Sequence, residues 1–155
     1  MIGEQIKRLR KSKRLSLRAF AKKTDLTHES IRYVESGRGS LIAVERIAAA
    51  YKKKITLVYN DGTEIRLPGS LGRQLASVRR LLKKKRDDIV GISLADIEAI
   101  ETENPRVLVA LVELYAKLLS DDGVTLGLEL RPPNNFDLKI SKANKENVHV
   151  TRSHC

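Results

Sequence analysis

The stretch that decides the fold covers residues 16–39 and reads SLRAFAKKTDLTHESIRYVESGRG. Its first residue, Ser16, stands directly before an apolar-rich segment and is a typical N-cap of a helix. Asp25 interrupts that segment, and aspartate is one of the few non-glycine residues that tolerate the left-handed backbone of a tight turn. Thr27 caps the next helix, which Gly37 ends. The stretch therefore predicts two short helices joined by a tight turn.

Helices are also predicted on both sides of this stretch. Apolar residues fall on one face at helical spacing in each of them: Ile2, Ile6 and Leu9 before the stretch, and Leu41, Val44, Ile47, Ala48 and Tyr51 after it. Residues 55–59 and 63–67 flank an Asp61-Gly62 step, which supplies the backbone freedom of a tight turn. This pattern predicts a β-hairpin at the end of the unit.

The same order of features recurs further along the chain. Three segments align with later ones in the same order: 2–10 with 71–79, 31–35 with 97–101, and 55–57 with 124–126. Within the first pair, glycine, glutamine and arginine recur at the same places. We therefore predict a mainly α fold with small β elements, made of two tandem units, each followed by a β-strand or hairpin. The expected divisions are residues 1–69, residues 70–131 and a flexible tail over residues 132–155.

Positive charge is concentrated in the first unit. Residues 1–69 carry 16 Lys and Arg against 7 Asp and Glu, a net charge of +9, whereas residues 70–131 carry 10 of each sign. A one-sided basic block indicates a polyanionic partner, most often nucleic acid.

The residues of the first unit resemble the Cro and phage-repressor (XRE) class of helix-turn-helix proteins. The matching positions are small Ala21, the buried Leu26, Ile31 and Val34, the Glu35-Ser36-Gly37 end of the third helix, and an ion pair between Arg10 and Glu35. One position departs from the class, because Leu17 stands where many members carry a glutamine that anchors the third helix to DNA.

The resemblance implies that the recognition helix, residues 27–36, lies in the major groove of double-stranded DNA. By position, the base-reading candidates are Thr27, His28, Glu29, Arg32 and Tyr33, and the phosphate-binding candidates are Ser16, Arg18, Arg38 and Ser40. Arg32 suits guanine O6 and N7. Glu29 either accepts from cytosine N4 or pairs with Arg32, and Thr27 meets either a base or a phosphate.

The second unit keeps the scaffold pair as Arg79 and Glu101 but loses the polar reading residues. Its equivalent positions carry Leu94, Ala95, Glu98 and Ala99, and its second helix is shorter. We expect this unit to keep the fold without reading DNA.

The second unit is instead expected to serve assembly. Residues 107–112 are apolar all round a helix, and residues 124–130 alternate like a strand. The strand pairs either with the hairpin of the first unit or with its counterpart in a second chain. A homodimer is the predicted assembly, with interface residues Val107, Leu108, Leu111, Val124, Leu126 and Leu128.

The leading functional prediction is a sequence-specific transcription regulator, a repressor that binds an operator as a homodimer. The alternative is an antitoxin that binds both its operator and a toxin. An enzyme is not expected, and neither is a cofactor or a metal, because His28, His149 and His154 are scattered and Cys155 is the single cysteine. No apolar run approaches the ~18 residues of a membrane span, and the predicted location is the cytoplasm.

Overall fold

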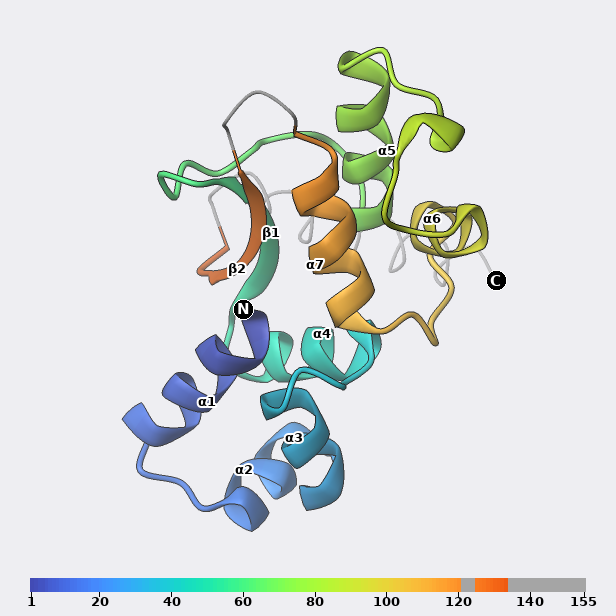
Figure 1. The fold of residues 1–155 in the computed structure, drawn as a ribbon. Coiled ribbons are helices and arrows are strands. Elements are labelled where there is room, and N and C mark those ends of the chain that lie inside the picture. The colour runs from blue at the N-terminus through green and yellow to red at the C-terminus, as the bar shows by residue number, and fades with distance from the viewer. Residues whose placement is uncertain (121–124, 134–155) are drawn as a thin grey trace, which may run out of the picture.

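The computed structural model describes residues 1–120 and 125–133 of the chain. Its α-helices are α1 (Ile2–Ser12), α2 (Leu17–Thr24), α3 (His28–Glu35), α4 (Leu41–Ala50), α5 (Leu71–Leu81), α6 (Leu94–Glu101) and α7 (Val109–Leu118). A short 3₁₀ helix, η1 (Arg86–Asp88), precedes α6, and the strands are β1 (Lys54–Tyr59) and β2 (Leu126–Arg131). Figure 1 shows α2 and α3 at one end of the molecule and α5 at the other. The predicted mainly α fold with small β elements is confirmed.

Side-chain caps start the short helices where the sequence places them. The hydroxyl oxygens of Ser16, Thr27 and Ser40 accept hydrogen bonds from backbone N–H groups three residues later, at 3.1 to 3.2 Å. Ser93 does the same at the start of α6, also at 3.1 Å. Asp25 has the left-handed conformation predicted for the turn, with φ 56° and ψ 41°. Each cap satisfies an amide that a helix leaves without an intrahelical partner.

The prediction that residues 63–67 form the second strand of a hairpin is wrong. After the turn, the backbone makes two hydrogen bonds to β1, from Tyr59 N to Thr63 O and from Ile65 N to Leu57 O, and then leaves the sheet. Pro68 follows within three residues and has no N–H to donate, so the segment cannot continue as a paired strand.

Strand β1 instead pairs with β2 of the second unit. The two strands are antiparallel, with Leu57 opposite Leu128. The sequence left open whether the strand near residues 124–130 pairs with the first unit or with a second chain. The structure shows pairing with the first unit of the same chain. Val124, which the sequence included in this strand, lies outside the described residues, as does the tail from residue 134 onward.

The units also meet at the starts of α4 and α7. The Leu41 amide donates to the Val107 carbonyl at 2.8 Å, and the Val109 amide donates to the Gly39 carbonyl at 3.0 Å. Leu41 and Val109 are the first residues of α4 and α7, respectively. The contact is therefore reciprocal. In each unit, the amide of the first helical residue donates a hydrogen bond to the other unit, and the carbonyl two residues earlier accepts one.

Two ion pairs occupy corresponding places in the two units. Arg10 Nε lies 2.5 Å from Glu35 Oε1, and Arg79 Nε lies 2.9 Å from Glu101 Oε2. In both cases the arginine also donates from NH1 to the carbonyl five residues later, at 3.0 and 2.9 Å. Each arginine therefore ties its helix both to the partner helix and to the turn that follows.

Glycine allows the first helix of each unit to approach the backbone at the end of a later helix. A Cβ on Gly3 would lie 2.5 Å from the Val34 carbonyl oxygen, and a Cβ on Gly72 would lie 2.4 Å from the Ile100 carbonyl oxygen. Such contacts are too short for any side chain, so glycine at both positions lets α1 pack on α3 and α5 on α6.

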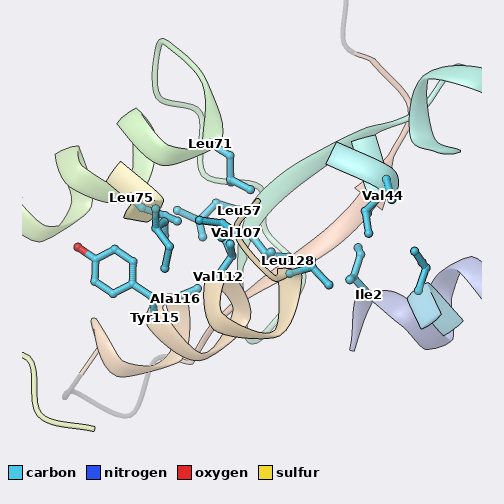
Figure 2. Packing of buried hydrophobic residues seen from close by; sticks show 14 of the residues in the cluster. Ile2, Val44, Leu57, Leu71, Leu75, Val107, Val112, Tyr115, Ala116 and Leu128 are labelled. Carbon is cyan, nitrogen blue, oxygen red and sulfur yellow. The ribbon is translucent and has the colours of Figure 1, made fainter. Parts of the chain in front are cut away.

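A single hydrophobic core runs through both units. Figure 2 shows its side chains continuing from Tyr115 and Leu75 in the second unit, through Leu57 and Leu128 on the two strands, to Ile2 in the first. All five residues are at most 4% exposed. Burial on this scale is the main stabilising contribution available to a fold of this size.

The predicted apolar helix over residues 107–112 differs from the observed α7. Leu108 is the N-cap residue and is 44% exposed, and the helix begins one residue later. Leu114, further along, is 37% exposed. The helix is therefore buried on the side facing β2, α4 and α6, and not on every side as predicted.

The carboxylate of Glu101 is the most heavily bonded charged group of the described core. It accepts from Arg79 twice at 2.9 Å, from Arg86 at 3.0 Å and from the Tyr115 hydroxyl at 2.6 Å. Burial alone would raise the pKa of Glu101, but the hydrogen bonds from Arg79, Tyr115 and Arg86 outweigh burial and lower this pKa to about 2.

We expect Glu101→Gln to lower the free energy of unfolding at pH 7 by about 3 kcal/mol, because it leaves buried arginine charge without its partner. Since the folded pKa lies below an unfolded value of about 4.3, the carboxylate contributes fully above that value. Its contribution is lost as the pH falls towards 2. Urea unfolding from pH 7 to pH 2.5 should therefore show a shallower acid-side decline in the variant.

The matched control is Glu98→Gln on the same helix, where the side chain is exposed. It should change the unfolding free energy by no more than about 0.5 kcal/mol. Equal effects of the two substitutions would contradict a structural role for the Glu101 cluster.

Candidate nucleic-acid interface

Helix α3 is held from behind by three other helices of the first unit. It packs against α1, α2 and α4, with Ile31 and Val34 fully buried beneath it. A Cβ on Gly39 would lie 2.4 Å from Val34 Cγ2, so glycine at this position lets the chain turn tightly after the helix. The result is a rigidly seated helix with its opposite face directed to solvent.

The five predicted base-reading residues all lie on or beside that outer face. Thr27, His28, Glu29, Arg32 and Tyr33 are exposed, and Tyr33 is 53% exposed. No ion pair joins Glu29 to Arg32, so the structure leaves both side chains able to meet an external partner. The Thr27 hydroxyl is already engaged with the Ser30 amide as the helix cap.

Arg38 and Tyr33 lie together at the end of α3. The Arg38 guanidinium carbon lies 5.4 Å from the centre of the Tyr33 ring, and Arg38 Nε donates to the Ser36 hydroxyl at 3.3 Å. A cation over an aromatic face at this distance is attracted by the ring. This contact places a predicted phosphate ligand beside a predicted base reader, a proximity that sequence spacing alone does not indicate.

The phosphate candidates differ in how accessible they are. Ser16 and Arg18 are exposed at the start of α2, where unpaired helical amides favour an anion. Ser40 is only half-buried, but its backbone forms a bridge to Leu108 of the second unit, and the next amide donates across that interface. Ser16, Arg18 and Arg38 are therefore each accessible, whereas Ser40 lies at the junction of the units.

Two structural residues of this site were missed from the sequence. Gly3 lets α1 approach α3, and Gly39 lets the chain turn tightly after α3; the recurrence of Gly3 as Gly72 was the advance signal in the sequence. Leu17, at the position that departs from the helix-turn-helix class, is half-buried and packs on the core. This position therefore contributes apolar packing where many members have a polar anchor.

Helix α6 presents a different outer surface from that of α3. Leu94 is 50% exposed and follows the Ser93 cap just as His28 follows Thr27, while Ala95 and Glu98 are exposed further along. Val90, just before the helix, is 84% exposed. An apolar and acidic face offers neither the donors that base edges require nor the positive charge that phosphates attract.

Two other kinds of site find no support in the described part of the chain. Residues 1–120 and 125–133 contain no group of three or more His, Cys, Asp or Glu side chains that could hold a metal ion. In the same residues, no helix has the length and apolar character needed to cross a membrane.

Comparison with known proteins agrees with the geometry of the first unit. Residues 2–53, roughly a third of the chain, match the family model of a helix-turn-helix domain. No curated protein and no solved structure gives a significant match to the chain. The matched region contains all of α1 to α4, together with the turn at Asp25 and the scaffold pair of Arg10 and Glu35. Residues 2–53 are therefore a helix-turn-helix domain of the Cro and phage-repressor type.

Proposed function

We propose that this protein is a sequence-specific DNA-binding transcription regulator that reads its operator with α3. The observation that supports this most strongly is the outer face of α3, which carries exposed polar side chains on a helix fixed by buried contacts. Arg32 is the principal specificity residue in this proposal, because a guanidinium can bind guanine O6 and N7 together. His28 and Glu29 would read neighbouring base pairs.

The phosphate contacts in this proposal come from around the recognition helix. Arg18 lies at the start of α2 and Arg38 just beyond α3, so the two positive side chains flank the reading face. Contacts of this kind fix the register of a protein on the duplex without reading sequence. The net charge of +9 over residues 1–69 would favour approach to the duplex.

Repression is the mode of regulation that we propose. A helix-turn-helix domain in the major groove covers the DNA that it occupies, and occupancy at a promoter blocks access to that promoter. A promoter fusion carrying the selected operator should lose expression when this protein is supplied, in the cytoplasm where it meets DNA. Increased expression would show activation instead.

The homodimer stays a prediction. The strand and loop residues assigned to its interface have partners within one chain, since Val107, Leu126 and Leu128 are all at most 7% exposed there. Leu108 is exposed and Leu111 half-buried. Of the described interface candidates, Leu108 and Leu111 are therefore the two that a second chain could contact.

The alternative function is that of an antitoxin, which binds a toxin as well as DNA. The exposed Val90 and Leu94 beside the acidic Glu98 favour a protein partner over nucleic acid at α6. If a neighbouring gene encodes a toxic protein, co-expression should abolish the toxicity and give a stoichiometric complex. Unchanged toxicity and no complex would exclude this alternative.

We expect Arg32→Ala to raise the Kd for the selected operator by roughly 5- to 150-fold, because one bidentate guanine contact is worth about 1–3 kcal/mol. It should also relax the preference at one base pair. The operator is first selected from random duplexes, and affinities are then measured by fluorescence anisotropy. The control is Arg80→Ala, which removes the same charge from an exposed position on α5. Unchanged affinity and preference for Arg32→Ala would show that α3 is not the reading helix.

Arg18→Gln should weaken binding to all sequences alike and reduce the salt dependence. Each phosphate contact contributes about 0.9 to the slope of log affinity against log salt, so the slope should become shallower by about 0.9. Binding titrations from 50 to 300 mM salt measure it, with Arg80→Gln as the control. A slope equal to that of the unsubstituted protein would mean that Arg18 does not touch the backbone.

A further inference from the structure

We infer that a single chain of this protein is already a complete pseudo-dimer, so that it binds DNA one chain at a time on an operator with a single half-site. This inference rests on the proposed function, because it concerns the form of the DNA element and the number of chains on it. The contacts that join residues 1–69 to residues 70–131 have the symmetry of a dimer interface.

The contacts between the units are exchanged in the way that a two-fold axis requires. In a symmetric dimer, a contact from residue i to residue j is repeated from j to i. Here Leu41 N donates to Val107 O while Val109 N donates to Gly39 O, with Leu41 and Val109 each beginning a helix. The two units therefore meet through an interface of the type that two copies of one chain share.

The sheet carries the same symmetry. Its antiparallel register places Leu57 opposite Leu128, and both side chains are at most 4% exposed. Helix α1 of the first unit packs on β2, and α5 of the second unit packs on β1. Each unit therefore lays its first helix across the strand of the other, which fixes their mutual orientation.

Backbone groups on both outer edges of the sheet are bonded within the same chain. On β1, Leu57 O accepts from Ile65 N at 2.8 Å and Tyr59 N donates to Thr63 O at 2.9 Å. These two edge groups are among those that a strand from a second chain would use.

On β2, a side chain replaces the extra backbone segment. Leu128 O accepts from Gln5 Nε2 at 3.0 Å, and Leu130 N donates to Gln5 Oε1 at 2.9 Å. The carboxamide of Gln5 supplies one donor and one acceptor, as a peptide group does. The corresponding Gln74 instead donates to Gly69 O at 2.8 Å. Groups of the same chain thus occupy backbone positions on both outer edges.

The pseudo-dimer has only one reading face. In a homodimer both recognition helices have the same sequence, but here α3 carries His28 and Arg32 where α6 carries Leu94 and Glu98. The cap and the Arg–Glu scaffold pair are present in both units. We therefore expect the operator to contain one specific half-site, without an inverted copy that a second recognition helix would read.

The first test compares two duplexes that carry the selected site. One has a single copy in about 25 base pairs, and the other has an inverted copy about 10 base pairs away, the spacing that a repressor dimer needs. Mass photometry should count one chain on the first duplex. On the second duplex, chains should bind independently, with an affinity gain no greater than about twofold. Paired loading, or a gain of tenfold or more, would overturn the inference. Failure to bind any duplex would instead contradict the proposed function.

The second test does not depend on DNA. Thr56 lies opposite Glu129 in the sheet, with its hydroxyl oxygen 3.4 Å from the Glu129 carbonyl oxygen. Cross-strand neighbours have Cβ atoms about 4.5–5.5 Å apart, close to the spacing of a disulfide. In a Cys155→Ser background, Thr56→Cys with Glu129→Cys should therefore form a disulfide within one chain under mild oxidation.

The product should run as a monomer of altered mobility on a non-reducing gel. Disulfide-linked dimers as the main product would show that β1 pairs with β2 of another chain and would overturn the inference. Thr56→Cys alone in the same background is the control and should keep its original mobility. The reduced double variant should keep the thermal melting curve of the background protein, which establishes that the pairing tested is that of the folded state.

Discussion

Strand β1 is hydrogen-bonded to β2 in antiparallel register, although three α-helices separate them along the chain. A strand edge cannot be buried with its backbone groups unpaired, so each unit can be completed only when the other is in place. The apolar residues on these strands, Leu57 and Leu128, then join the interiors of the two units into one core. The position of α3, and therefore the surface offered to DNA, depends on this long-range pairing through α1 and α4.

The local features of the first unit could be predicted because each depends on residues close together in sequence. Caps at Ser16 and Thr27 act on amides three residues away, and the left-handed turn at Asp25 is a property of one residue. The pair of Arg10 and Glu35 was inferred from a family resemblance and is present with a 2.5 Å contact. Exposure of the five base-reading candidates followed from the buried spacing of Ile31 and Val34 on the opposite face.

The features that could not be predicted from the sequence depend on residues that lie far apart in the chain or on the exact path of a turn. Residues 63–67 have a hairpin pattern, but Pro68 ends their pairing, and β1 takes β2 as its main partner instead. The role of Gln5 was equally hidden, because a glutamine on a helix gives no sign that it will imitate a peptide group at a sheet edge. Nor could spacing indicate that Arg38 lies over Tyr33, since this depends on the turn at Gly37, where φ is 84°.

Joining two units in one chain changes which residues each unit must keep for folding and for its outer helix surface. In a homodimer, one sequence serves both positions, so a substitution on the recognition helix alters both reading faces together. In this chain, each unit has its own sequence, and a change such as that between His28 and Leu94 affects only one face. The contacts between the units and the scaffold within each unit carry no such freedom, because the core needs Leu57 with Leu128, and the second unit needs Arg79 with Glu101. The tether also makes pairing independent of protein concentration, because the second strand is always within reach of the first. The second unit is thus required for the fold whatever it contributes to DNA binding, because without it the sheet, the shared core and the packing that positions α3 would lose their support.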